Sequence, residues 1–314
     1  ADRMRAMRPA VGWSLELSTV PLLKPGSASA RALRFLPAGT RVYLPSLPSD
    51  PPSAIEDALA LLRRENSALL PVPHIAATRE ESAASLERRI ARWQRASSDR
   101  VREALVVRGE SLATHSTAPP ATPPPPPASP PHGAFRSSLE LLESGALQRC
   151  GIETVGLCGH PEGVGGISAA AARAALADKL RWAEASGVTA RVVTQFTFFS
   201  GCATEFVDAL RADGFSVPVS LGVVGPSSLP LRQRMAERCG VGAPQSPYVT
   251  PFLRRVAAWQ AERAPEAGVQ AIHLYPFGGV AEAMKWLRDF ADDEQFEAAM
   301  TLDPPPPDAK AFSS

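Results

Sequence analysis

Polar side chains follow short apolar runs at several places in this 314-residue sequence. Carboxylates and imidazoles exchange protons, a guanidinium binds anions, and an amide gives two donors and one acceptor to a heteroaromatic ring edge. We therefore expect a site that binds a planar organic cofactor or substrate rather than a hydrolytic site. The residues concerned are Glu16, His74, Arg108, Glu110, His160, Glu162, Gln195, His273 and Tyr275.

The sequence lacks the motifs of nucleophilic catalysis and of metal binding. The sequence has no G-x-S-x-G, and no cysteine stands beside a plausible base. The four cysteines have no C-x-x-C spacing, so we interpret them as structural thiols. His160 and Glu162 alone are a weak signal for metal binding, and we predict no metal site.

Glu16 alternates with Leu15 and Leu17, so its side chain points away from theirs. A carboxylate buried in a barrel needs a compensating partner or a raised pKa. Two interpretations stay open: a proton donor whose pKa is raised by burial, or an ion pair with a basic side chain such as Arg41. Each lone histidine has the alternative of donating to a backbone carbonyl.

Eight short apolar runs alternate with helical patterns, which is typical of parallel β/α units. Their number favours a (β/α)₈ barrel, and no G-x-G-x-x-G follows the first run to support a dinucleotide fold. Ser53 with Glu56, and Thr78 with Glu81, predict capping boxes; Ser168 and Gly187 predict the two ends of one helix. The expected strands are 13–17, 41–47, 68–75, 103–109, 154–159, 190–196, 217–224 and 271–277.

The expected organisation is one barrel over residues 12–292, with an extension at 1–11 and a tail at 293–314. A proline-rich stretch at about 115–133 predicts a loop insertion after the fourth strand; a ligand for an SH3-type domain is the alternative. Lys plus Arg (33) nearly balances Asp plus Glu (32), so we expect no nucleic-acid partner. No apolar run approaches the length of a membrane span. The Arg-rich start favours a mitochondrial over a cytoplasmic location.

Several segments, in order, resemble the catalytic barrel of the methylenetetrahydrofolate reductase family. W-S-L-E-L resembles the family's S-x-E motif, P-V-P-H-I-A its P-H motif, and A-L-V-V-R-G-E its A-L-R-G-D motif. G-H-P-E-G resembles the H-P-E stretch and V-V-T-Q-F-T-F-F the I-T-Q-F-F-F stretch. Two later segments, from Pro218 and from Gln270, resemble the seventh- and eighth-strand regions. The resemblance spans Trp13 to about Leu287.

This resemblance implies a (β/α)₈ flavoprotein in which NADH or NADPH reduces bound FAD, which then passes hydride to methylenetetrahydrofolate. Glu16 matches the general acid and Gln195 the residue that binds the pterin edge. Glu110 stands where the family has an Asp that faces flavin and folate. His74, Arg108, Gly109, His160 and Glu162 are the expected cofactor contacts, and Gly109 lets backbone approach closely.

The chain also departs from the family pattern. Glu110 replaces Asp, the second strand ends in Y-L-P-S-L-P, and V-G-G-I-S follows G-H-P-E-G. Asp178 and Lys179 lie out of register with the family's charged FAD contacts. Two hypotheses follow. The first is an active flavin- and folate-dependent reductase. The second is a flavin-deficient barrel that serves as a structural subunit of a larger assembly with protein partners, for which a mitochondrial assembly is the candidate.

Overall fold

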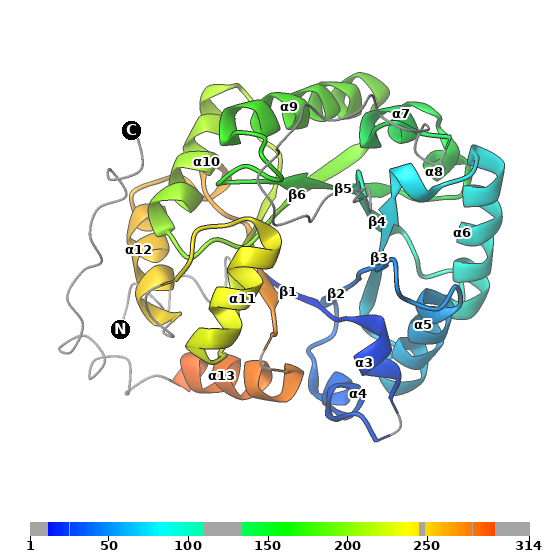
Figure 1. The fold of residues 1–314 in the computed structure, drawn as a ribbon, viewed down its shortest axis with the longest axis horizontal. Helices are drawn as coiled ribbons and strands as arrows, with labels where there is room; N and C mark the ends of the chain where they lie inside the picture. Colours follow the sequence, from blue (N-terminus) through cyan, green and yellow to red (C-terminus); the bar gives the residue numbers. More distant parts are fainter. Residues whose placement is uncertain (1–11, 25, 110–133, 245–248, 278, 293–314) are drawn as a thin grey trace, which may run out of the picture.

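The chain forms a closed barrel of parallel strands (Figure 1). A computed structural model describes residues 12–24, 26–109, 134–244, 249–277 and 279–292. Within these residues eight strands pair in chain order, and β1 pairs with β8 to close the sheet. The strands are β1 (Gly12–Glu16), β2 (Arg41–Leu44), β3 (Leu70–Ala76), β4 (Glu103–Val107), β5 (Thr154–Gly159), β6 (Thr189–Thr194), β7 (Val219–Val224) and β8 (Ala271–Tyr275). The predicted (β/α)₈ fold is confirmed.

Helices surround the strands and cover their outer face (Figure 1). Of those described, none combines the length and hydropathy that a membrane span requires. The α-helices are α3 (Thr19–Leu23), α4 (Ala28–Ala32), α5 (Ala54–Glu65), α6 (Ala83–Ser97), α7 (Ser138–Glu143), α8 (Ala146–Arg149), α9 (Ala169–Ser186), α10 (Ser200–Ala212), α11 (Leu229–Cys239), α12 (Thr250–Ala261) and α13 (Val280–Asp292). The 3₁₀ turns are η1 (Leu33–Phe35), η2 (Ala77–Arg79) and η3 (Pro265–Ala267).

The predicted ends of α9 are confirmed, and the two predicted capping boxes are wrong. Ser168 Oγ accepts the Ala171 N–H at the start of α9, and Gly187 ends it with φ +64°. Ser53 has helical backbone angles, so its hydroxyl donates to Asp57 and caps no N–H. Thr78 lies in η2, and the cap of α6 is Ser82, whose Oγ accepts the Ser85 N–H.

Apolar side chains fill both sides of the sheet. A large cluster lies between strands and helices and includes Leu59, Trp93 and Val106, all at most 1% exposed. A smaller cluster inside the barrel consists of Tyr43, Val72, Leu105 and Val193. Burial on both faces explains why the strands read as apolar runs.

Charged side chains form the floor of the barrel, at the amino ends of the strands. Glu103 of β4 accepts a hydrogen bond from Arg41 Nε of β2 at 2.7 Å, and its other oxygen lies 3.3 Å from Arg191 Nε of β6. The Tyr43 hydroxyl donates to the same carboxylate at 3.2 Å. Burial and the negative charge of Glu103 raise the pKa of Tyr43. The alternative that paired Arg41 with Glu16 is therefore wrong.

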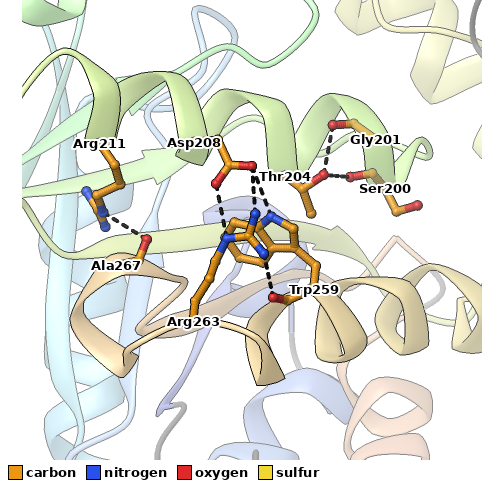
Figure 2. Close-up of polar contacts among 8 residues, drawn as sticks. All are labelled: Ser200, Gly201, Thr204, Asp208, Arg211, Trp259, Arg263 and Ala267. Atoms are coloured by element: carbon orange, nitrogen blue, oxygen red, sulfur yellow. Dashed lines mark hydrogen bonds and ion pairs between the residues drawn. The ribbon is translucent and has the colours of Figure 1, made fainter.

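A polar clamp joins α10 to α12 on the outside of the barrel (Figure 2). Asp208 on α10 accepts from Trp259 Nε1 at 3.1 Å and from Arg263 Nη2 at 3.1 Å. The Arg263 guanidinium lies 4.2 Å from the centre of the Trp259 ring, so a cation–π contact reinforces the two bonds. This clamp holds the two helices together.

Candidate active site

Glu16 lies between two histidines at the carboxyl ends of the strands. Its Oε2 is 3.7 Å from Nε2 of His273 on β8 and 3.8 Å from Nε2 of His74 on β3. Both Nε2 atoms are buried and have no hydrogen-bond partner among the described residues. The separations are too long for direct hydrogen bonds. Three polar groups from three strands therefore surround a small space that a water or ligand atom can bridge.

Ser14 and two aromatic rings fix the orientation of His273. Ser14 Oγ lies 3.0 Å from Nδ1, and the side chain of His273 is fully buried. The rings of Tyr43 and Tyr275 meet the imidazole edge-on, with centroids at 4.6 and 4.7 Å. When the Ser14 hydroxyl donates to Nδ1, the ring hydrogen sits on Nε2 and faces Glu16.

The pKa of Glu16 in this cluster differs from the one predicted for a proton donor. Burial raises the pKa of Glu16, but His273 and His74 together lower it by more, and the net pKa lies below its usual value. Burial also lowers the pKa of His74 to about 4. At neutral pH the ligand-free site therefore holds an ionised Glu16 beside a neutral His74, and the expectation of a burial-raised Glu16 pKa is wrong for this state.

Gln195 follows β6 and presents its amide nitrogen. Its backbone N–H donates to the Gly159 carbonyl at 2.8 Å, and its side-chain Oε1 accepts the Phe196 N–H at 3.0 Å. Only the amide oxygen can accept that bond, so the NH₂ group remains for a ligand. The Tyr275 hydroxyl donates to the neighbouring Thr194 carbonyl at 3.1 Å. This hydrogen bond links the His273 cluster to the Gln195 backbone.

An aromatic cluster lies beside Gln195. The Phe196 ring meets the rings of Tyr275 and Phe277 with centroids at 5.3 Å in both cases, and Phe198 at 5.6 Å. These rings stand at the ends of β6 and β8. They form an apolar cluster next to Gln195.

The structure describes the first two residues, Arg108 and Gly109, of the Arg-Gly-acid segment that follows β4. The Arg108 side chain is exposed and makes no hydrogen bond or ion pair with a described residue. Gly109 has φ +89°, and a Cβ there would lie 2.8 Å from Thr78 Oγ1. Glycine is therefore required where the ends of β3 and β4 approach each other. Glu110 lies outside the described residues.

The structure gives His160 and Glu162 different surroundings. Glu162 Oε2 accepts the Gly242 N–H at 2.6 Å, so this carboxylate ties the loop after β5 to the loop after α11. His160 Nδ1 is buried without a partner among the described residues. Burial, with the charge of nearby Lys179, lowers the pKa of His160 to about 4.

Two residues of this region were missed or set aside at the sequence level. Lys179 lies near His160 and Cys158; it donates to Ser138 Oγ at 3.4 Å, and burial lowers its pKa. The sequence signal for Lys179 was its place beside Leu176 and Leu180, on the apolar face of the expected helix. Ser14 could have been found from its spacing, because it stands two residues before Glu16 on the same face of β1.

The barrel thus brings Glu16, His74, His273 and Tyr275 together, with Gln195 attached through Thr194. No described group of three or more His, Cys, Asp and Glu side chains could hold a metal ion. Two hollows in the described surface, of about 370 and 480 Å³, lie against α11 and against α3–α5. Neither hollow is lined by a residue of the candidate site.

No family model matches the chain. Solved structures align with most of it at low identity. A GH10 endoxylanase from a sugarcane soil metagenome is 10% identical, with a TM-score of 0.51 over 87% of this chain and 88% of that one. Yersinia pestis DHPS with a pterine-sulfa conjugate is 13% identical, with a TM-score of 0.47 over 90% and 94%. An oxaloacetate acetylhydrolase is 11% identical, with a TM-score of 0.48 over 96% and 87%. The endoxylanase similarity shows the fold alone.

Proposed function

We propose that this protein is a methylenetetrahydrofolate reductase-like flavoprotein that transfers hydride from NADH or NADPH, through FAD, to methylenetetrahydrofolate. The observation that carries the proposal is the link from Glu16 through His273 and Tyr275 to the Gln195 backbone. The two side chains expected to act on the pterin thus belong to one connected cluster at one end of the barrel. Sequence position alone does not require that link.

The described residues offer groups suited to FAD. Arg108 is an exposed cation with no described partner, and Lys179 is a partly buried cation with only a weak bond to Ser138. Cations of this kind suit a pyrophosphate, and the unpartnered His160 Nδ1 suits a polar edge of the cofactor. Bound FAD would supply hydride storage between the two substrates. Arg108, Lys179 and His160 would hold the cofactor.

Glu16 requires a change of state to act as an acid. Its side chain is 22% exposed in the ligand-free protein. A ring bound over this edge excludes the remaining water, and desolvation raises a carboxyl pKa. We expect Glu16 to take up a proton when folate binds and to donate it to the folate ring nitrogen. The Gln195 NH₂ group would donate to an acceptor on the pterin edge and hold the ring in place.

A second candidate is a flavin-deficient barrel that serves as a structural subunit. Glu162 favours it, because one oxygen of its carboxylate is already bonded to the Gly242 N–H. The low pKa of Glu16 in the ligand-free state favours it as well. Copurification with partners in fixed stoichiometry would support this candidate. Gel filtration of a free monomer or small homo-oligomer would count against it.

An absorbance scan through the flavin bands separates the two candidates, followed by folate turnover assays. We expect bound flavin, and we expect Glu16→Gln to lose turnover while it keeps the flavin. Glu56→Gln is the matched control, because Glu56 pairs with Arg92 on the outer helices and should leave turnover unchanged. A colourless protein that fails to take up added FAD would overturn the reductase. Full turnover of Glu16→Gln would remove Glu16 from the mechanism.

A further inference from the structure

The end of β6 stops pairing with its neighbour β7, and the residues that follow pack against Gly222 of β7. The two strands pair at Val192 with Val219 and at Val193 with Ser220. At the next residue, the fully buried Thr194, the side-chain Oγ1 accepts the Gly222 N–H at 2.8 Å. A side-chain bond thus stands in for the next rung of the ladder. The backbone of residues 194–196 is held directly against Gly222.

Gly222 leaves the space that this backbone occupies. A Cβ at this position would lie closest to the Thr194 carbonyl oxygen, and 2.8 Å from both the Gln195 carbonyl carbon and the Phe196 nitrogen. These are backbone atoms of a strand end and cannot rotate away as a long side chain can. The φ of Gly222 is not in the left-handed region, so the need for glycine here is one of space.

We infer that Gly222 is a positioning residue for Gln195: the missing side chain lets the backbone of residues 194–196 pack against β7 and sets where the Gln195 amide stands. The inference rests on the proposed function, in which that amide binds the pterin. Gly222 lies opposite His273 in the β7–β8 register, so it belongs to the same level of the barrel as the Glu16 cluster.

Three contacts transmit a shift of this backbone to the amide. The Tyr275 hydroxyl donates a hydrogen bond to the Thr194 carbonyl, and the Gln195 N–H donates one to the Gly159 carbonyl. The Phe196 N–H donates the third to Gln195 Oε1. A methyl group at residue 222 would have to push the closest backbone atom away by about 1 Å to reach ordinary contact, and misplacement of about 1 Å can cost about 100-fold in a positioned site. We therefore expect Gly222→Ala to weaken folate binding by about 10-fold or more.

Gly201→Ala is the matched control. Gly201 lies in the first turn of α10, no atom lies within 4 Å of its Cβ position, and its φ is not positive. Its carbonyl accepts a hydrogen bond from Thr204 Oγ1 (Figure 2), and alanine keeps that carbonyl. This control changes a glycine near the same strand end without touching residues 194–196.

The first readout needs no ligand. The side-chain NH₂ resonances of the ¹⁵N-glutamine-labelled protein are recorded, and the Gln195 signal is assigned by its loss in Gln195→Ala. We expect Gly222→Ala to shift this signal and Gly201→Ala to leave it in place. If Gly222→Ala does not fold, Tyr275→Phe replaces it, because it removes the bond to the Thr194 carbonyl and adds no atoms; the same signal should move. An unmoved Gln195 signal would overturn the inference.

The second readout is a double-mutant cycle on binding of methyltetrahydrofolate. Gly222→Ala and Gln195→Ala should each weaken binding, and the double variant should be no weaker than Gln195→Ala alone. If the affinity losses of the two single variants multiply in the double variant, Gly222 affects folate binding independently of Gln195, and the inference is overturned. If the wild-type protein binds no folate but the Gln195 signal still moves in Gly222→Ala, the positioning role stands and the proposed function fails.

Discussion

Ser14 Oγ lies 3.0 Å from Nδ1 of His273, across the β1–β8 seam that closes the barrel. Because Nδ1 is occupied by this hydroxyl, Nε2 is the nitrogen that faces Glu16. The charge state of the carboxylate therefore depends on a residue that does not touch it.

Ser14→Ala should leave Nδ1 buried without a partner and cost about 1–3 kcal/mol of unfolding free energy. The hydrogen should also redistribute between the two ring nitrogens. Imidazole ¹⁵N shifts of His273 and urea unfolding check both effects. Ser18→Ala is the control, because Ser18 is exposed and caps no N–H. Ring shifts identical to those of the wild type would contradict the role of Ser14.

Acid should destabilise the protein through His74. Its folded pKa of about 4 lies below the ordinary histidine value of 6.5, so the unfolded chain binds more protons between these pH values. The unfolding free energy should therefore rise with pH across this window, by up to about 1.4 kcal/mol per pH unit for one histidine. The lowered pKa of Glu16 acts in the same direction, because its contribution is lost as pH falls below the usual range.

Urea unfolding at pH 4.5 and at pH 7 measures this slope. His74→Gln should flatten it, and His160 should account for much of what remains, since its pKa is also lowered to about 4. The same slope in wild type and His74→Gln would show that His74 is not buried as a neutral ring.

Glu103→Ala should be strongly destabilising. It leaves Arg41 and Arg191 without their carboxylate, and breaking a buried pair costs about 3–5 kcal/mol. Glu153→Ala is the matched control, because Glu153 and its partner Arg102 are 69% and 55% exposed and their pair should contribute less than about 1 kcal/mol. Chemical unfolding compares the two variants, and equal losses would contradict a buried floor.

Gly109→Ala and Gly39→Ala separate backbone strain from crowding. Both glycines have positive φ, +89° and +78°, but only Gly109 has close neighbours at its Cβ position. Gly39→Ala should cost about 1–2 kcal/mol from the left-handed backbone alone. Gly109→Ala should cost more because Thr78 must move. Equal unfolding free energies would show that Thr78 yields without cost.

The strands were predictable because burial on both faces leaves a run of apolar residues, and β5 was predicted to the residue. Their ends were less so. The predicted 41–47 strand stops at Leu44, since Pro45 has no N–H for the ladder. The Ser53 box failed because φ −85° and ψ −5° put its backbone in the helical region. The predicted capping box at Thr78 failed because the Thr78 N–H is bonded to the Arg108 carbonyl.

The candidate site was predictable in position and less so in partners. The carboxyl ends of the strands must meet, which brings Glu16 near His74 and His273. The partner of Glu103 could not be read locally, because Arg41 and Arg191 lie 62 and 88 residues away. The bond from Glu162 to Gly242 likewise joins loops 80 residues apart.

The floor carries a consequence for how the barrel is assembled. Its arginines come from different halves of the chain, Arg41 from the first and Arg191 from the second, and Glu103 stands between them. A polypeptide that stops after β4 holds one cation for this carboxylate and exposes the edges that β5 and β8 would cover. Two half-barrels expressed separately should therefore recognise each other in part through Arg191, because its carboxylate partner, Glu103, lies in the other half.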